Sequence, residues 1–412
     1  MLLLMRPEEA SLLDICSLLF SSNIGNSKFV DCPDPDGTRE PFGRRWIIFV
    51  SVLVLKLLRA VAVPMAGLGS RVEYCLNLLS QNGGFFRLIL NYFRGNIDKR
   101  IELDSSISVG DERYYAALSI MAAKASYENN NHIRSVVKDH WKTIRTRPQH
   151  KRSSSKINKN KIIVAFRGTE PFDADAWSSD FGISWYEIPG VGKIRGGFMK
   201  ALGLQKSQGW PSKQDDGKPE TAYLGGALAV LFPAVLAMHE EWALLERVEG
   251  IYTFGQPRVG DEKFREFMKS VIDKYGFKYF RVVYSYDLVP RLPYDDSTLM
   301  FKHFGTCIYY NSFYQGKVVA EEPDKNYFSM IWVISKLINA LWELIRSFVI
   351  TYRKGAEYQE GSLLRVLRVI GLLIAGLPAH CLQDYVNATR LGSSDVFLSG
   401  LRSNGHKVLK MQ

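Results

Sequence analysis

The chain has 412 residues, 46% of them apolar, and a net charge of +11, so it can bury the core of one large domain or of two. The excess of lysine and arginine favours acidic partners, either nucleic acid or an anionic membrane surface. The sequence contains no zinc-finger spacing, aromatic RNA-binding pattern or long basic helix, which argues against nucleic acid.

The cysteines indicate a reducing compartment. Five of them are scattered along the chain without a C-x-x-C pair, which is typical of an intracellular protein. The apolar start, Met1 to Met5, lacks a basic region and is a poor signal peptide. The residue spacings lead us to expect neither a metal nor a cofactor.

The N-terminal region, residues 1–105, is predicted to associate with a membrane or a lipid droplet. An apolar segment from Trp46 to Leu55 follows two arginines and, after a basic interruption, resumes over 61–66. Its charge-free part is shorter than the about 20 residues that a membrane-spanning helix needs. The pattern fits a helix or hairpin lying in one lipid monolayer, and it also fits a buried core helix. The flanking Arg44, Arg45 and Trp46 favour the membrane.

Residues 106–412 alternate predicted strands with predicted helices, which indicates an α/β fold with a mostly parallel sheet flanked by helices. The predicted strands are 162–166, 183–188, 251–254, 277–286 and 304–310, and the predicted helices are 111–145, 198–205, 224–241, 262–275, 330–350 and 363–377. A basic stretch from Lys142 to Lys161 is predicted to be a solvated loop, with contact to anionic lipid as the alternative.

The helix predicted over 224–241 looks like the second half of a nucleophile elbow. Gly225 and Gly226 lie in its first turn, where they let the backbone approach a neighbouring strand or a ligand. In the elbow motif G-x-S-x-G the serine lies two residues before the last glycine. If Gly225 is that glycine, Tyr223 occupies the position of the serine, and the chain contains no intact G-x-S-x-G.

A helical insertion is predicted over about residues 323–377. In the helix 330–350, Lys336, Asn339, Glu343 and Arg346 share one face, and the remaining surface is apolar. An apolar surface of this width needs either a protein core or a membrane. We expect the insertion to act as a lid or as an interfacial surface.

Candidate catalytic groups lie at the carboxyl ends of predicted strands, where the active sites of parallel sheets collect. Asp287 ends a strand and precedes two prolines, which suits the orienting acid of a triad, although an isolated aspartate more often caps a turn. His380 lies late in the chain after an apolar helix, so Asp287 and His380 follow the hydrolase order of nucleophile, acid, base. Thr169 follows a strand and a glycine and offers its N–H as an oxyanion donor, although R-G-T alone is usually a strand-ending turn.

Six motifs carry a resemblance to a known family. They are residues 162–170 (IIVAFRGTE), 175–177 (DAW), 196–198 (GGF), 224–229 (LGGALA), 252–260 (YTFGQPRVG) and 287–291 (DLVPR). Together they resemble the class 3, fungal-type lipases and, within them, the plant oil-body triacylglycerol lipase group, over about residues 110–392. The resemblance implies an α/β-hydrolase fold and a Ser-Asp-His esterase that acts on acylglycerols at a lipid–water interface. By motif match Asp287 would be the triad acid, His380 the base, and the N–H groups of Thr169 and Leu224 the oxyanion donors.

The chain departs from this family where the nucleophile belongs. The family carries a helix, a short strand and T-G-H-S before L-G-G-A-L-A, whereas here Tyr223 joins directly to Leu224. By typical element lengths, about 15–30 residues are missing, and the central elbow strand is among them. One hypothesis is an active lipase of which this sequence is an incomplete version; the other is a non-catalytic lipid-droplet or membrane-surface protein. As written, the chain is expected to lack ester hydrolysis. It is expected to reside inside the cell at a lipid droplet or membrane, either as a monomer or as a homo-oligomer.

Overall fold

A computed structural model describes the chain over residues 4–5, 10–24, 27–31, 42, 45–46, 48–57, 60, 85–93, 107, 110–126, 162–168, 184–201, 225–293, 295, 301–327, 330–355 and 358–403. Several predicted features lie outside these residues. They are the two oxyanion candidates Thr169 and Leu224, the apolar stretch 61–66, the basic stretch 142–161 and most of the predicted helix 111–145.

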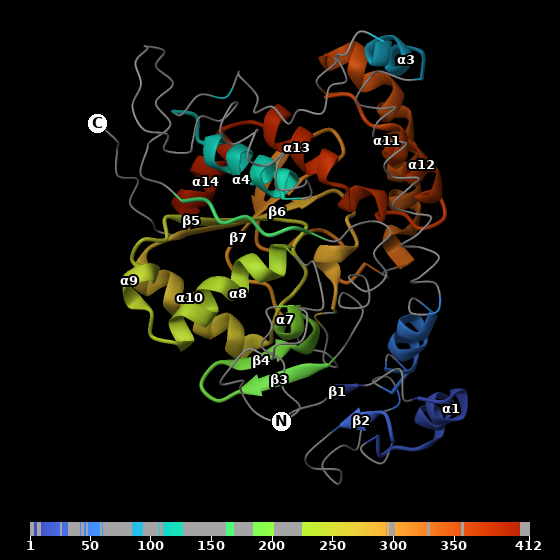
Figure 1. The fold of residues 1–412 in the computed structure, drawn as a ribbon, viewed down its shortest axis with the longest axis vertical. Helices are drawn as coiled ribbons and strands as arrows, with labels where there is room; N and C mark the ends of the chain where they lie inside the picture. The colour runs from blue at the N-terminus through green and yellow to red at the C-terminus, as the bar shows by residue number, and fades with distance from the viewer. Residues whose placement is uncertain are drawn as a thin grey trace.

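A four-stranded sheet lies at the centre of the described structure (Figure 1). Its order is β5 (Gly250–Phe254), β6 (Lys278–Tyr284), β7 (Thr306–Tyr310) and β8 (Gly316–Val319). The first three strands are parallel, and β8 pairs antiparallel with β7. The mostly parallel sheet and its three strands between residues 250 and 310 are therefore confirmed. The sequence analysis missed β8, a short and half-exposed strand that returns from β7 through a tight turn.

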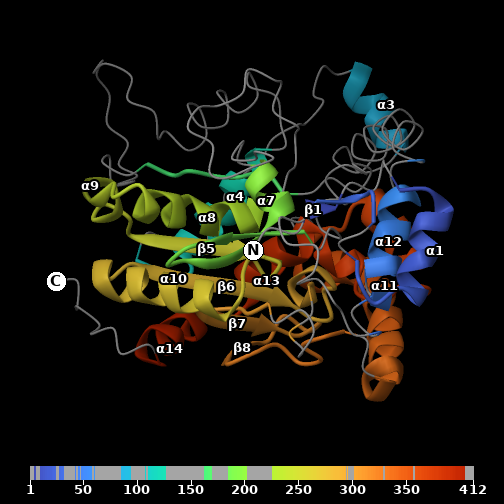
Figure 2. The same cartoon turned by 90° about the horizontal axis from the view of Figure 1, so that it is seen from below.

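Helices cover both faces of this sheet (Figures 1 and 2). Successive side chains of a strand point to opposite sides, so each face of the sheet contributes to a core of its own. On one face α8 (Gly225–Met238) and α10 (Glu262–Tyr275) share an apolar core with Tyr279 of β6. On the other face α4 (Tyr114–Ala125), α13 (Leu382–Leu391) and α14 (Asp395–Ser403) share a second core with Phe280, the next residue of β6. The two cores hold the sheet rigidly between two layers of helices.

Two predicted helices are confirmed on the first face. The helix predicted over 224–241 is α8, with Pro233 inside it, and the helix predicted over 262–275 is α10. α10 begins where the side chain of Asp261 accepts a hydrogen bond from the Phe264 N–H at 3.0 Å, and it ends at Gly276 in the left-handed conformation. A short helix, α9 (Trp242–Leu245), follows α8.

The strand predicted over 162–166 is wrong. Residues 162–168 form an irregular segment without strand pairing, although Ala165 packs against the core and the ring of Phe166 contacts that of Phe232 in α8. A strand needs a hydrogen-bonded neighbour, and β5 pairs only with β6 among the described strands. In Figure 2 the segment lies on the side of β5 opposite β6. The elbow strand that the family resemblance places between them has no counterpart in the sequence, so the segment has no ladder to join.

The N-terminal region forms a small core of its own. Helix α1 (Leu12–Phe20), strand β2 (Val30–Asp31) and a helical stretch over 48–57 pack together against Trp185. Strand β1 (Leu4–Met5) pairs antiparallel with β2. The stretch 48–57 buries Ile48 and Val52 and exposes Leu53 and Leu57, so one of its faces is a core face. Within the described parts of the chain, every helix is too short or too polar to cross a membrane.

Trp185 begins a β-hairpin that lies beside α10. Strand β3 (Trp185–Ile188) pairs antiparallel with β4 (Gly192–Arg195), which confirms the strand predicted over 183–188. The short helix predicted at 198–205 is α7 (Gly196–Ala201), which begins two residues earlier.

The predicted insertion contains two helices, and the polarity of the first is inverted. They are α11 (Val333–Lys354) and α12 (Ser362–Ile370), and a third helix, α3 (Phe85–Phe93), lies towards the same end of the molecule (Figure 1). In α11 the charged residues Lys336, Glu343 and Arg346 are buried, and most of the large apolar residues face outward. Residues 371–377, predicted to continue α12, form turns.

Candidate active site

Asp287 lies three residues beyond the carboxyl end of β6 and is completely buried. Three donors hold its carboxylate. Oδ1 accepts the backbone N–H of Val289 at 2.9 Å, and Oδ2 accepts both Nδ1–H of His380, at 2.9 Å, and the hydroxyl of Tyr385. A buried carboxyl group needs hydrogen-bond partners, and these three hold the Asp287 side chain in place beside the imidazole.

His380 is brought to Asp287 by the turn that joins α12 to α13. The turn Pro378–His380 is a short 3-10 helix, and α13 follows it directly. Because a carboxylate only accepts, Nδ1 of His380 carries the proton and the other ring nitrogen, Nε2, keeps its lone pair. The His380 side chain is 20% exposed, whereas Asp287 is inaccessible. The imidazole is therefore the member of the pair that can meet a reacting group.

Gly255 provides the space for this pair. It follows β5 in the left-handed region, with φ of +63°. A Cβ atom there would lie 2.8 Å from Nδ1 of His380 and 2.9 Å from Oδ2 of Asp287, so no other residue fits without moving the pair. The sequence analysis quoted Gly255 within a motif but assigned it no role; its signal was a glycine directly after a buried strand.

The first turn of α8 lies at the same edge of the sheet. A Cβ on Gly226 would touch Gln256, the neighbour of Gly255 in the chain, at 3.0 Å. A Cβ on Gly225 would clash with the backbone of the segment 162–168, at 2.7 Å from the carbonyl oxygen of Arg167. The start of α8, before which the nucleophile is predicted to be missing, therefore lies close both to the segment 162–168 and to the Asp287–His380 pair. Thr169 and Leu224 adjoin this point in the chain but lie outside the described residues.

Arg291 fixes the loop that carries Asp287. Its guanidinium is buried and donates to the backbone oxygens of Asp287 and Ser285 and to those of Pro323 and Asp324 across the fold. The two prolines after Asp287 were expected to suit it to the role of an orienting acid. The structure shows that the arginine makes most of the contacts, a role that the D-L-V-P-R pattern does not reveal.

A second buried group of charges lies under the loop. Glu322 accepts from Arg281 at 2.9 Å and lies 3.8 Å from Arg258, which in turn donates to the carbonyl oxygens of Arg291 and Pro293. Burial alone would raise the pKa of Glu322, but the neighbouring guanidinium groups outweigh it and hold the pKa well below its usual range. His303 belongs to the same group, and burial together with Arg281 lowers its pKa well below 6.5. The network supports the loop that carries Asp287.

A third network joins the insertion to α13. Asp384 accepts from Arg346 at 2.6 Å and from Arg368 at 3.0 Å, and Arg368 also contacts Glu343 and Glu360. Burial raises the pKa of Glu343, because desolvation penalises its charged form more than the arginines favour it. Asp384 precedes Tyr385, the residue that hydrogen-bonds to Asp287. The polar seam of α11 is thus linked through α13 to the candidate catalytic pair.

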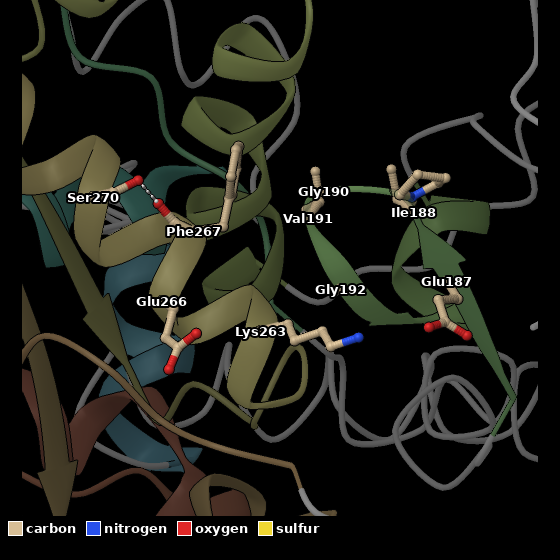
Figure 3. Close-up of a pocket in the computed structure, with 10 residues that line it drawn as sticks. Glu187, Ile188, Gly190, Val191, Gly192, Lys263, Glu266, Phe267 and Ser270 are labelled. Atoms are coloured by element: carbon tan, nitrogen blue, oxygen red, sulfur yellow. Dashed lines mark hydrogen bonds between the residues drawn. The ribbon is translucent and has the colours of Figure 1, made fainter.

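A cavity of about 720 Å³ lies elsewhere, between the β3–β4 hairpin and α10 (Figure 3). It is lined by Glu187, Lys263 and Glu266 together with apolar and glycine residues of the hairpin, and neither Asp287 nor His380 borders it. Among the residues that the structure describes, no group of histidine, cysteine and carboxylate side chains is arranged to hold a metal ion.

An aspartate and a histidine paired at the carboxyl edge of a parallel sheet, beside a glycine-rich helix start, define an α/β-hydrolase type of protein. Comparison with known proteins specifies the family. Residues 223–297 match the sequence profile of the class 3 lipases. The chain is 35% identical to triacylglycerol lipase OBL1 of Arabidopsis thaliana, covering 95% of this chain and 94% of the relative, and 36% identical to the protein of that name from Nicotiana tabacum, covering 85% and 84%. The chain belongs to the class 3 lipase family.

The same comparison shows a difference in length between this chain and its relatives. The alignment to the Arabidopsis protein extends over 490 positions, which is more than the 412 residues of this chain. The relative therefore contains residues that have no counterpart here. A third protein, triacylglycerol lipase OBL1 of Ricinus communis, is 32% identical over 502 positions and shows the same excess.

Proposed function

We propose that this site is the acid–base half of a serine esterase that acts on acylglycerols at a lipid–water interface, and that the chain as written does not hydrolyse esters because it lacks the nucleophile. The observation that carries the proposal is the 2.9 Å contact of His380 Nδ1 with Asp287 Oδ2 beside the start of α8. The substrate class follows from the relatives, which are named triacylglycerol lipases.

In the complete arrangement each group has a defined task. A serine oxygen attacks the ester carbonyl carbon while Nε2 of His380 takes the serine proton, and Asp287 holds the ring and offsets the charge of the imidazolium. The backbone N–H groups of Thr169 and Leu224 receive the oxyanion. The imidazolium then protonates the departing glycerol oxygen, and water, deprotonated by His380, releases the fatty acid from the acyl-enzyme.

Tyr223 does not replace the serine. Its hydroxyl oxygen is separated from the backbone by an entire aromatic ring, whereas a serine oxygen is one carbon from Cα. The distance between His380 and the start of α8 suits a serine side chain rather than a tyrosine side chain. Gly225 and Gly226 hold that helix start tightly against the segment 162–168 and Gln256. The chain therefore keeps the proton-transfer machinery without the group from which His380 would take a proton.

The first experiment measures ester turnover with and without the missing part. The chain as written, and a version with an oil-body lipase segment ending in T-G-H-S inserted between Tyr223 and Leu224, are assayed with a soluble short-chain nitrophenyl ester. We expect turnover only from the inserted version and its loss on His380→Ala or on replacement of the inserted serine by alanine. Turnover by the chain as written that disappears with His380→Ala, or a folded inserted version without turnover, would contradict the proposal.

A second candidate function follows from the inverted polarity of α11. Exposed apolar side chains on α11 and α12, in a chain without a nucleophile, favour a non-catalytic protein of lipid-droplet or membrane surfaces inside the cell. The expressed transcript separates the two functions. A transcript form that encodes G-H-S between Tyr223 and Leu224 supports the lipase, and a single uninterrupted frame as printed supports the lipid-surface protein.

A further inference from the structure

The outer face of α11 is apolar from Val333 to Val349, apart from Ser335. Ile334 is 72% exposed and Ile338 64%, and the same face continues through Leu341, Ile345 and Phe348. Helices of soluble proteins place this kind of face against their core. In α11 the charged side packs against the protein, and the apolar face is exposed to the outside. It is directed outward while the polar seam is fully used inside.

The chain after α11 continues the same surface. Val366, Val369 and Ile370 of α12 are exposed, and so are Leu372, Leu373 and Ile374 in the following turn, with Leu373 at 87%. No exposed residue of α11 or of the stretch 358–377 carries a carboxylate, whereas α11 ends in the exposed residues Tyr352, Arg353 and Lys354. We refer to the exposed apolar residues of 331–349 and 366–374 as the outer apolar face. Among the described residues, Tyr352, Arg353 and Lys354 form an aromatic and basic end of this face, and no exposed acid adjoins it on α11 or over 358–377.

Other exposed apolar helices lie at the same end of the molecule. Figures 1 and 2 share their horizontal axis, and both place α1, α3, α11 and α12 at the right-hand end and α9 at the left. α1 exposes Leu12, Leu13 and Phe20, and α3 exposes Phe86, Tyr92 and Phe93. Exposed apolar side chains on several helices at one end of the molecule favour a protein or membrane interaction there.

We propose that the outer apolar face is the surface by which this protein seats on a lipid monolayer that contains anionic headgroups. The choice of a lipid partner rests on the proposed function, and two observations support it independently. The face mixes aliphatic and aromatic residues without any acid, and one end of it carries arginine, lysine and tyrosine, the composition expected at a headgroup boundary. A protein interface would carry acceptors and mixed charges at its rim.

The outer apolar face lies close to the Asp287–His380 pair. The turn after α12 lies against the loop of Asp287: the Leu288 N–H donates to the carbonyl oxygen of Gly376 at 3.4 Å, and Tyr327 donates to that of Ala375. On the inner side of α11, Asn339 donates to Ser285 at 2.9 Å. Leu373 is seven residues before His380 in the chain. A protein seated on this face therefore presents its acid–base pair beside the lipid surface rather than on the far side.

Flotation with lipid droplets tests the proposal. Triolein droplets coated with phosphatidylcholine and phosphatidylserine are mixed with the chain as written and with the double variant Ile338→Glu/Leu373→Glu, which changes two exposed positions and leaves the core intact. Losing two large apolar side chains from the interface is expected to lower the partition coefficient by at least about tenfold. Leu244→Glu, an equally apolar and 46% exposed position on α9 at the opposite end, is expected to leave it unchanged.

Each outcome decides the proposal. Equal binding of the double variant and the chain as written, or an equal loss with Leu244→Glu, would overturn it. So would a dimer in sedimentation that the double variant dissociates while droplet binding persists, since the face would then join two copies of the chain. Ile338→Ser/Leu373→Ser supplies an uncharged version. The soluble-ester assay tests the proposed chemistry separately, because a short nitrophenyl ester needs no lipid surface. A failure to hydrolyse this ester would not change the flotation result.

Discussion

Gly255→Ala is expected to break the Asp287–His380 pair without touching either residue. Gly255 has φ of +63°, and a left-handed conformation costs a residue with a Cβ about 1–2 kcal/mol. The added Cβ would lie 2.8 Å from Nδ1 of His380, so the ring must move away, and the hydrogen bond to a charged carboxylate that is lost contributes about 1.5–3 kcal/mol. We therefore expect a total loss of about 2.5–5 kcal/mol in the free energy of unfolding.

The chain provides a matched control at the end of α10. Gly276 has φ of +68° and nothing within 4 Å of a Cβ built there, so Gly276→Ala adds only the conformational cost of about 1–2 kcal/mol. Urea unfolding followed by tryptophan fluorescence measures both variants, and proton NMR follows the downfield Nδ1–H signal of His380. The reasoning is refuted if Gly255→Ala loses no more stability than Gly276→Ala, or if it keeps the Nδ1–H signal.

Three further predictions follow from the buried networks. Tyr385→Phe removes one donor from Asp287 and is expected to cost about 1–3 kcal/mol and to shift the His380 Nδ1–H signal, which a purely structural substitution would leave in place. Arg368→Met leaves three carboxylates without their shared partner and is expected to cost about 3–5 kcal/mol in urea unfolding, whereas Glu343→Gln, at a carboxyl whose pKa burial already raises, is expected to cost under about 1 kcal/mol. The buried His303 has a pKa well below 6.5, so the unfolded chain binds a proton first as the pH falls below 6.5. Stability is then lost by up to about 1.4 kcal/mol per pH unit, and His303→Gln, which keeps a donor towards the Pro290 carbonyl, is expected to flatten this slope.

The parts of the fold that the sequence predicted have strong local signals. The strands β5, β6 and β7 are short apolar or β-branched runs that end at turn residues, and α10 begins with a capping aspartate and ends with a glycine. The pairing of Asp287 with His380 was predicted from chain order and strand ends, and it joins residues 93 positions apart. Each of these inferences needs only a pattern within a few residues and one topological rule.

The parts that failed depend on partners remote in the chain. The apolar segment 162–166 has every local property of a strand, but a strand exists only beside another, and its expected neighbour is missing from the sequence. The polar seam of α11 was recognised, whereas its burial was not, because that burial depends on Asp384 and Arg368, which lie outside the helix. Arg291 was read as part of a motif, and its backbone partners at 323 and 324 cannot be inferred from spacing.

We infer that Asp287 and His380 are a functional acid–base pair that lacks only the nucleophilic serine. Covalent labelling by a fluorophosphonate tests this inference most directly. In this reaction the serine oxygen bonds to phosphorus, fluoride leaves, and His380 takes the serine proton. The account predicts that the version with the inserted T-G-H-S segment is labelled on that serine, that His380→Ala in the same version is not, and that the chain as written remains unlabelled. Labelling of the inserted version at an undiminished rate after His380→Ala would contradict the account.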